Sequence, residues 1–208
     1  MPTLRFGGSR DVTTQAPLDP SRSSYYISDA LYRDLIASFS EWQHDALAVT
    51  DVFVRDEFRQ LLEREARLLD QLRYDEWLAM YAPECVYWVP STPNGGDPRR
   101  EIAIMFDDRR RLEDRIYRMR TGFAWSQAPA SRTVRLITNV EVFSTADADK
   151  RMLRSNFLIS EFWGDETRQL TGWAGHRVAR GEGGWKIAAK QVNLIECDQS
   201  IRNPSIIL

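Results

Sequence analysis

The hydrophobic and polar positions follow a helical period in the first half of the chain. Residues 28–43 predict a helix in which Ser28 is the N-cap. The clearest helix is predicted over residues 56–73, and a short one over residues 74–81 stops before Pro83. The apolar stripe of the long helix consists of Phe58, Leu61, Leu62, Leu68, Leu69 and Leu72. Stripes of this kind predict helices that each bury one side against a common core.

After Pro83 the pattern changes to a strand, a loop and a further helix. Residues 84–91, ECVYWVPS, are rich in β-branched and aromatic side chains and predict a strand. Residues 92–101 carry the Gly, Pro and Asn of a loop. Residues 106–122 are expected to be helical, with Gly122 as the C-terminal cap. The apolar seam of that helix consists of Leu112, Ile116 and Met119.

The second half of the chain alternates apolar and polar residues and predicts four strands, over residues 132–145, 150–163, 167–180 and 184–197. In the first of them the alternating apolar residues are Val134, Leu136, Val140 and Val142. The links between the strands are short and polar, which indicates antiparallel pairing. The apolar phase of the last strand changes near Gln191, which predicts a bulge or bend there.

Helices followed by a meander of long strands predict an α+β fold. We expect a curved, mostly antiparallel sheet that wraps around the N-terminal helices as a cone with an open mouth. Residues 1–50 are interpreted as an N-terminal extension and residues 51–208 as the main domain. Within the extension, residues 1–24 are rich in Gly, Pro, Ser and Thr and read as a tail that orders only against a partner.

Composition excludes several functional classes. The 208 residues carry a formal net charge of −2, and the basic residues are scattered, which argues against nucleic-acid binding. The basic run at 109–120 is interrupted by acids and has an apolar seam, so we interpret it as a solvated or partner-facing helix. No run of about 18 apolar residues predicts a membrane span, and no apolar segment near the start predicts a secretory signal. We expect a cytoplasmic protein.

The candidate metal ligands are few and badly spaced. The only histidines are His44 and His176, and the two cysteines, Cys85 and Cys197, each lack a Cys or His nearby. Structural zinc sites need paired ligands at short spacing, so we predict no metal site and reduced thiols. The chain also lacks a G-x-S-x-G nucleophile motif and a Gly-rich loop between a strand and a helix.

One acid–base candidate lies within the apolar stripe of the long helix. Glu65 is flanked by Leu61 and Leu68, and an apolar environment raises the pKa of a carboxyl group toward the range of a general base. The alternative is that Glu65 has a structural role and is held by an arginine or a tyrosine hydroxyl, because buried carboxylates are usually paired. We favour the second interpretation.

Three blocks of the sequence carry a family resemblance. They read EARLLDQLRYDEWLAMYAPECVYWVP, FDDRRRLEDRIYRMRTGFAWSQAPASRTVRLITNVEV and GWKIAAKQVNLIECDQSIRNPSIIL. Together, over roughly residues 55–208, they resemble the small (β) subunit of aromatic-ring-hydroxylating dioxygenases, the Rieske non-haem iron oxygenases. Residues 1–50 resemble the family less.

The resemblance implies a cystatin-like or NTF2-like cone and a non-catalytic, structural role. It implies a partner α subunit that carries a Rieske [2Fe–2S] cluster and a mononuclear Fe(II), within an α3β3 assembly built on a β trimer. A reductase, sometimes with a ferredoxin, then supplies electrons from NADH, and the assembly dihydroxylates aromatic compounds with O₂. No cofactor is expected in this chain, since a Rieske centre takes two Cys and two His, and the iron site takes further His.

Two other hypotheses stay open on the sequence alone. One is a stand-alone isomerase or dehydratase of the same fold with Glu65 as its acid or base, and the other is a ligand-binding or scaffold module without an enzyme partner. For the subunit hypothesis we expect contacts at the strand 132–139 and at the apolar C-terminus. The candidate contact residues are Trp125, Arg132, Arg135, Asn139, Pro204, Ile206, Ile207 and Leu208.

Overall fold

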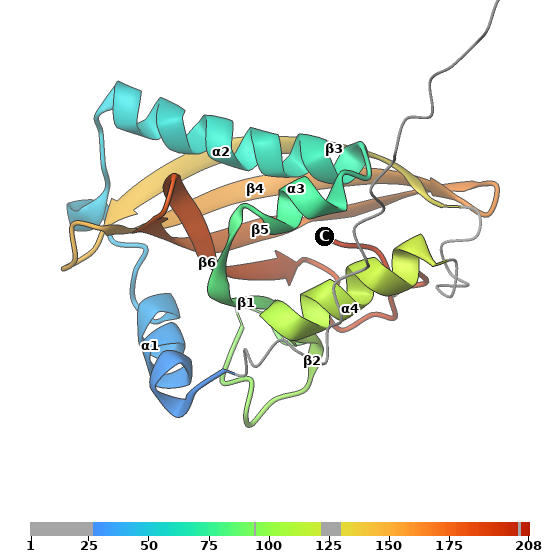
Figure 1. Cartoon of the computed structure of the whole chain (residues 1–208), viewed down its shortest axis with the longest axis horizontal. Coiled ribbons are helices and arrows are strands. Elements are labelled where there is room, and N and C mark those ends of the chain that lie inside the picture. Colours follow the sequence, from blue (N-terminus) through green and yellow to red (C-terminus); the bar gives the residue numbers. More distant parts are fainter. Residues whose placement is uncertain (1–26, 94, 122–129, 204) are drawn as a thin grey trace, which may run out of the picture.

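The structure is a computed structural model that describes residues 27–93, 95–121, 130–203 and 205–208 (Figure 1). Its helices are α1 (Asp29–Phe39), the short 3-10 helix η2 (Asp45–Leu47), α2 (Val52–Asp70), α3 (Tyr74–Leu78) and α4 (Arg109–Arg120). Its strands are β1 (Tyr81–Pro90), β2 (Ala103–Asp108), β3 (Arg132–Ser144), β4 (Lys150–Trp163), β5 (Glu166–Gly181) and β6 (Gly184–Leu194).

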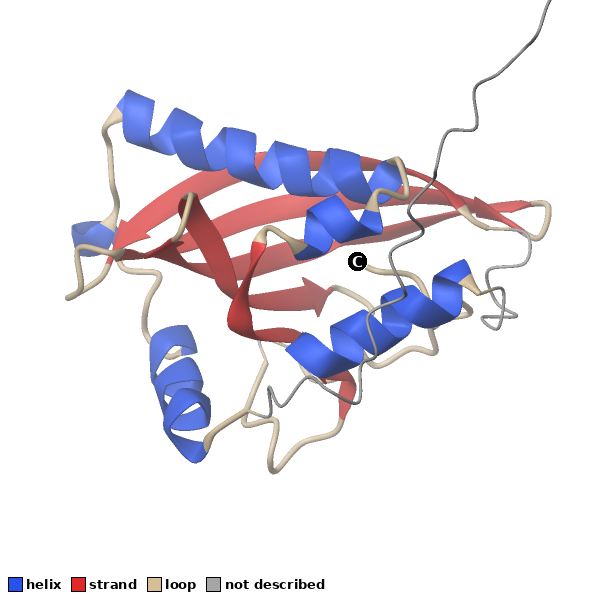
Figure 2. Cartoon of the chain, in the orientation of Figure 1, coloured by secondary structure: helices blue, strands red, loops and turns tan. Residues whose placement is uncertain are grey.

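The strands form one curved sheet in the order β2-β1-β6-β5-β4-β3. All neighbours pair antiparallel except β1 and β6, which are parallel. Figure 2 shows α2 and α3 lying over one face of this sheet. We call that face the inner face and the opposite one the outer face. The predicted α+β cone with a mostly antiparallel sheet is confirmed.

Helix α2 supplies the wall of the cone that faces the sheet. Asp51 caps its N-terminus, where the carboxylate accepts from the backbone N–H groups of Phe53 and Val54 at 2.9 and 3.1 Å. The predicted stripe is buried at Phe58, Leu62, Leu68 and Leu69, whereas Leu72 follows the helix and is 45% exposed. Glu65 lies within that buried stripe.

The prediction that the helix after the loop begins at residue 106 was wrong. Residues 106–108 belong to β2, where Phe106 pairs with Trp88 and Asp108 pairs with Val86 of β1. The helix begins only at Arg109, because the Asp108 carboxylate caps it by accepting from the N–H of Arg111 at 2.9 Å. Gly122, the expected C-terminal cap, lies outside the described residues.

Two bulges set which side chains reach the core. In β3 the register shifts between Thr138 and Glu141, where Asn139 has a positive φ of 50°. Val134 and Leu136 therefore point to the outer face, whereas the prediction put them in phase with the buried Val142. In β6 the shift leaves Ala188 as the extra residue, three positions before the predicted Gln191.

Helix α1 covers part of the outer face. The hydroxyl of Ser28 caps it as predicted, accepting from the N–H of Leu31 at 3.1 Å. Leu35 packs with Val86 and Trp88 of β1. Residues before 51 thus contribute to the packed body, while the boundary drawn at residue 50 stays a prediction.

The C-terminal segment enters the cone. Figure 1 shows the C-terminal end between α3, α4 and the sheet. The side chains of Ile206, Ile207 and Leu208 are each 4% exposed and belong to the same hydrophobic cluster as Trp77 and Phe157. The interior of the cone is therefore filled partly by the chain's own end segment.

Candidate functional site

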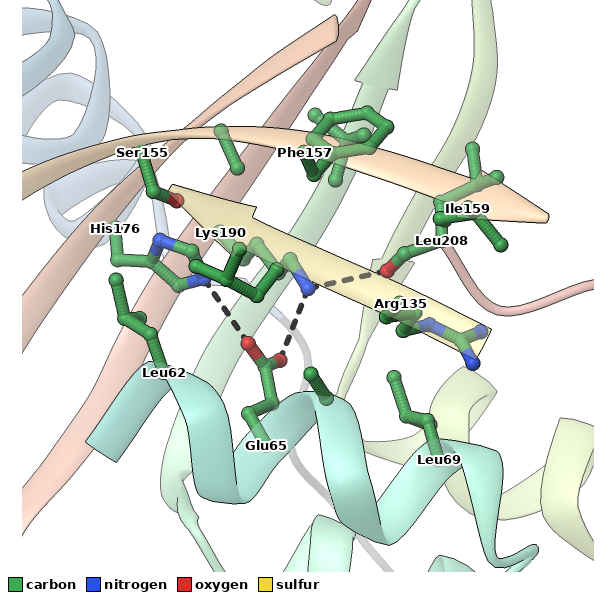
Figure 3. Close-up of a pocket in the computed structure, with 14 residues that line it drawn as sticks. Leu62, Glu65, Leu69, Arg135, Ser155, Phe157, Ile159, His176, Lys190 and Leu208 are labelled. Carbon is green, nitrogen blue, oxygen red and sulfur yellow. Dashed lines mark hydrogen bonds and ion pairs between the residues drawn. The ribbon is translucent and has the colours of Figure 1, made fainter. Parts of the chain in front are cut away.

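A buried polar cluster lies inside the cone and is centred on Glu65. Its Oε1 atom accepts from the Tyr81 hydroxyl at 2.6 Å, from the Lys190 Nζ at 3.1 Å and from the Trp77 Nε1 at 3.2 Å. Its Oε2 atom lies 3.1 Å from His176 Nε2. Figure 3 shows Glu65 on α2 facing His176 of β5 and Lys190 of β6. Four donors from four elements therefore converge on one carboxylate.

These donors keep Glu65 ionised. Burial alone raises the pKa of Glu65, but the Lys190 charge and the bonds from His176 and Tyr81 outweigh burial and hold that pKa well below its usual range. Burial lowers the pKa of His176, which favours the neutral imidazole, and burial also lowers the pKa of Lys190. The expectation that apolar surroundings raise the pKa of Glu65 was wrong, since a cation lies within hydrogen-bond distance.

Lys190 joins this cluster to the C-terminal segment. Its Nζ also donates to the main-chain oxygen of Leu208 at 3.1 Å and lies 5.5 Å from the centroid of the Tyr87 ring. The Tyr87 hydroxyl donates to the same Leu208 oxygen. Lys190 thus has a carboxylate, a main-chain oxygen and an aromatic face around it, which suits a buried ammonium group.

Arg135 of β3 makes a second link to the segment. Its side chain, only 5% exposed, forms an ion pair with Asp70 and donates to the main-chain oxygen of Ile207. Asp70 also accepts from the Thr133 hydroxyl at 2.8 Å and from the Arg135 N–H at 2.9 Å. The end of α2 and the edge of β3 are therefore tied together beside the C-terminal residues.

A third link fixes the segment at the mouth of the cone. The carboxylate of Glu161, 1% exposed on β4, accepts from the side-chain amide of Asn203 at 2.6 Å. Arg168 of β5 lies 3.9 Å from the other oxygen of Glu161. Three buried polar contacts, at Asn203, Ile207 and Leu208, thus hold one stretch of main chain within the cone.

Little empty space remains next to Glu65. The cavity lined by Glu65, Ser155, His176 and Lys190 has a volume of about 20 Å³. Small-molecule pockets measure about 300–1,000 Å³, whereas a cavity of roughly 10–15 Å³ on the same measure holds one water. The cavity therefore lacks room for an organic substrate beside Glu65, the base that the sequence offered as a candidate.

The cysteines and histidines do not form a ligand set. Cys85 and Cys197 are both buried and free, and burial raises the pKa of the Cys85 thiol to about 12. His176 directs its Nε2 to Glu65, and His44 lies at the surface before η2. No group of three His, Cys, Asp or Glu residues with metal-binding geometry occurs among the described residues. These donors do not suit an iron–sulfur cluster or a mononuclear iron.

The structure separates the residues that were predicted to contact another subunit. Arg132 and Asn139 are exposed on β3, whereas Arg135 points into the cone. Ile206, Ile207 and Leu208 are buried by their own chain, so they offer no surface to a partner in this arrangement. Trp125 and Pro204 lie outside the described residues.

The sequence pattern did not predict that Lys190, Tyr87 and His176 belong to one buried cluster with Glu65. Lys190 and Tyr87 lie in no motif. The inward direction of Tyr87 follows from alternation along β1, and that of Lys190 from alternation along β6 together with the bulge at Ala188. His176, considered in the sequence only as a possible metal ligand, contacts the helix residue Glu65. The predicted structural role for Glu65 is supported, including the tyrosine hydroxyl, although the cation is a lysine rather than an arginine.

No described helix is both long and apolar enough to span a membrane.

Curated relatives match the central part of the chain. The chain is 39% identical over 89 residues to the 2-halobenzoate 1,2-dioxygenase small subunit of Burkholderia cepacia, covering 40% of this chain and 54% of that protein. It is 35% identical over 105 residues to the benzoate 1,2-dioxygenase subunit beta of Acinetobacter baylyi, covering 48% and 62%. The matches thus span only about half to three-fifths of these two relatives.

Solved structures share the fold over a greater length. The beta subunit of benzoate 1,2-dioxygenase from Burkholderia mallei superposes with a TM-score of 0.61 at 27% identity, covering 76% of this chain and 99% of that one. A chain of naphthalene 1,2-dioxygenase superposes with a TM-score of 0.65 at 24% identity, covering 88% and 95%. The family model described as ring hydroxylating beta subunit matches residues 64–199, more than half of the chain. The chain therefore belongs to the family of ring-hydroxylating beta subunits.

Proposed function

We propose that this chain is the non-catalytic, structural beta subunit of an aromatic-ring-hydroxylating dioxygenase. The observation that carries the proposal is the closed interior of the cone. The one candidate base, Glu65, is ionised and bound by four donors, and the adjacent cavity of about 20 Å³ admits no substrate. A family member with a filled cone acts through the surfaces that it offers to other subunits.

The partner in this proposal is a large α subunit that carries the oxygen chemistry. It would hold a Rieske [2Fe–2S] cluster and a mononuclear Fe(II), for which this chain lacks a suitable set of donors among its described residues. We propose an α3β3 assembly in the cytoplasm, with a β trimer and with electrons that pass from NADH through a reductase and, in some systems, a ferredoxin.

The substrate class that we propose is aromatic. The relatives are named for 2-halobenzoate, benzoate, toluate and benzene dioxygenases. We assign the choice among such rings to the α subunit, because the cavity next to the buried cluster has a volume of only about 20 Å³.

The alternative, a stand-alone isomerase or dehydratase with Glu65 as acid or base, is not favoured. A general base must reach its substrate within hydrogen-bond distance. The Glu65 carboxylate is instead bound by side chains of this chain, namely Trp77, Tyr81, His176 and Lys190. The main-chain oxygen of Leu208 lies on the other side of Lys190 and accepts from its Nζ.

Co-expression tests the proposal. The small subunit is produced with and without the dioxygenase large subunit of its own organism, and the molar mass is measured by light scattering. We expect the two chains to co-purify, and we expect ring dihydroxylation of aromatic acids or hydrocarbons only when the large subunit is present. A small subunit that stays monomeric beside its large subunit would contradict the proposal.

A further inference from the structure

A cleft lies between α1 and the connection from β3 to β4, apart from the buried cluster at Glu65. Figure 1 shows α1, η2 and that connection at the same end of the molecule. The cleft has a volume of about 340 Å³, which falls within the range of about 300–1,000 Å³ for small-molecule sites. We call it the α1 cleft. Six of its lining residues carry the argument: Asp34, Glu41, Trp42, Lys150, Met152 and Arg177.

The floor of the α1 cleft is apolar and fixed by packing. Trp42 and Met152 are 6% and 2% exposed and form a small hydrophobic cluster with Phe143. The rings of Trp42 and Phe143 meet edge to face, with their centroids 5.4 Å apart. A ligand in the cleft therefore finds a rigid aromatic and thioether surface for an apolar group.

Arg177 adds a hydrogen-bond donor to this floor. Its side chain comes from β5 and is almost fully buried, and one of its terminal nitrogens, Nη2, forms an ion pair with Asp34 of α1. The other terminal nitrogen, Nη1, is buried and has no hydrogen-bond partner. A buried donor without an acceptor destabilises the state that contains it. An acceptor atom brought against this guanidinium is therefore favoured.

The charges around the cleft limit what that acceptor belongs to. Besides the Arg177–Asp34 pair, the Lys150 Nζ lies 3.1 Å from the Asp147 carboxylate. Glu41 is exposed and forms no ion pair with a cation of the described residues. Its φ of 48° is one that residues other than glycine seldom adopt. Because Glu41 leaves the lining with one carboxylate in excess, an anion without a cation of its own is repelled.

We propose that the α1 cleft binds a small zwitterion, namely a free α-amino acid with an apolar side chain. The carboxylate of this ligand accepts from Arg177, and its ammonium group faces Glu41. Its apolar side chain lies against Trp42 and Met152. The site uses none of the residues of the buried cluster, and the inference does not depend on the proposed function.

The test uses the full-length small subunit and three probes of similar size. L-leucine carries both charges, 4-methylpentanoate lacks the ammonium group, and 3-methylbutylamine lacks the carboxylate. We expect calorimetric titration to show millimolar or tighter binding of L-leucine. Each analogue should bind about tenfold more weakly, because it loses one charge-assisted hydrogen bond.

Three substitutions then locate the bound probe, with circular dichroism and the urea midpoint as checks on folding. Arg177→Met should weaken L-leucine binding about tenfold. Arg180→Met is its control on the same strand, because Arg180 stacks 4.5 Å from the centroid of the Trp185 ring and does not line the cleft. Glu41→Gln should weaken binding of L-leucine and leave that of 4-methylpentanoate unchanged or stronger.

A steric variant keeps the test decisive if Arg177→Met fails to fold. Ala37 is exposed on α1 and lines the cleft, so Ala37→Trp fills the cleft without removing a charge and should abolish L-leucine binding.

Each contrary result overturns the proposal. A wild-type chain that does not bind L-leucine at millimolar concentration has no such site. Equal affinities for L-leucine and 4-methylpentanoate would show that the ligand class is wrong. Wild-type affinity in the Arg177→Met or Ala37→Trp chain would place the ligand elsewhere. None of these results bears on assembly with the large subunit, so the proposed function stands or falls by co-expression alone.

Discussion

The inner and outer faces of β3, β4 and β5 differ in how their side chains are buried and paired. On the inner face, Arg135 and His176 contact acids of α2, and the C-terminal segment covers the aliphatic side chains between them. On the outer face, Leu136 is 58% exposed, and Arg132 has an aromatic ring beneath it and no ion pair with a carboxylate of the described residues. Residues that alternate along one strand thus have opposite surroundings: one set is paired and buried within the chain, and the other faces solvent.

The reactive side chains of the inner face suggest catalysis but have a structural role. Glu65, His176 and Lys190 have the composition of an acid–base site, yet their mutual bonds satisfy them within the fold. Val134 and Leu136 have no reactive group, yet they stay 61% and 58% exposed on the outer face of the sheet. In this chain the buried polar groups serve stability, whereas the exposed apolar side chains of β3 contribute little to it.

The largest effect is expected when the C-terminal segment is shortened. Deletion of residues 206–208 removes three buried aliphatic side chains, each 4% exposed, and leaves Lys190, Tyr87 and Arg135 without their main-chain acceptors. Burial of such side chains stabilises by about 1.5–3 kcal/mol each. We expect the free energy of unfolding in urea to fall by about 5 kcal/mol or more, and the free small subunit to lose its fold.

The same experiment decides whether residues 206–208 stabilise the fold or contact another subunit. If the shortened chain keeps its urea midpoint and only its assembly with the large subunit is weakened, the segment serves the interface as the sequence had suggested. In that case the burial of Leu208 within the cone would contribute little to the free energy of unfolding.

A smaller effect is expected when the buried ion pair is broken. Lys190→Met leaves the Glu65 carboxylate buried without a cation, which costs about 3–5 kcal/mol. Lys186→Met is the matched control on the same strand, because its Nζ donates only to the oxygen of Ala79 at a partly exposed position. The double variant Glu65→Met with Lys190→Met should recover part of the loss, since the charge is then removed altogether. Urea unfolding of all four chains measures the difference, and equal losses for the two lysine variants would contradict the ion pair.

Much of this arrangement follows from sequence pattern, and the exceptions have physical causes. The helices at 28–43 and 56–73 and the four long strands were predicted because each has a long apolar period. The strand β2 was missed since its six residues run directly into the helix that Asp108 caps. The outward direction of Val134 was missed because one extra residue at Asn139 reverses the phase of β3.

The buried cluster was harder to predict than the fold. Glu65 was found because a carboxylate in an apolar stripe is unusual. Its cation lies 125 residues away on β6, and no local spacing reveals a contact between a helix and a strand so far apart. The place of the C-terminal residues was missed for the same reason: their apolar character indicates burial without indicating whether the cover is the chain itself or a partner.

Acid should weaken the interior by a moderate amount. The pKa of Glu65 is lowered in the folded chain from an ordinary value of 4.5, so its contribution is complete above pH 4.5 and is lost as the pH falls below that value. The pKa of His176 is lowered from 6.5, so stability also falls as the pH drops below 6.5 and the unfolded chain takes up a proton. We expect a loss of about 1–2 kcal/mol between pH 5 and pH 3.5 in urea unfolding.

Glu65→Gln should flatten the lower part of that pH dependence, below pH 4.5, whatever its stability at pH 7. Glu63→Gln is the control, since Glu63 is on the exposed side of the same helix and pairs there with Arg59. A Glu65→Gln chain that keeps the full wild-type slope below pH 4.5 would show that other carboxylates carry the acid response.

The smallest effect is expected at the exposed apolar residues on the outer face of β3 in the free chain. Leu136 is 58% exposed and Val134 is 61% exposed, so replacing either by Asp removes little buried area. Surface substitutions of this kind change the free energy of unfolding by about 0.5 kcal/mol or less. The same substitution at Leu69, which is 3% exposed on α2, should cost several-fold more. If Leu136→Asp destabilises the free chain as much as Leu69→Asp does, the outer face of β3 is covered by the chain itself, and the contrast between the two faces of the sheet disappears.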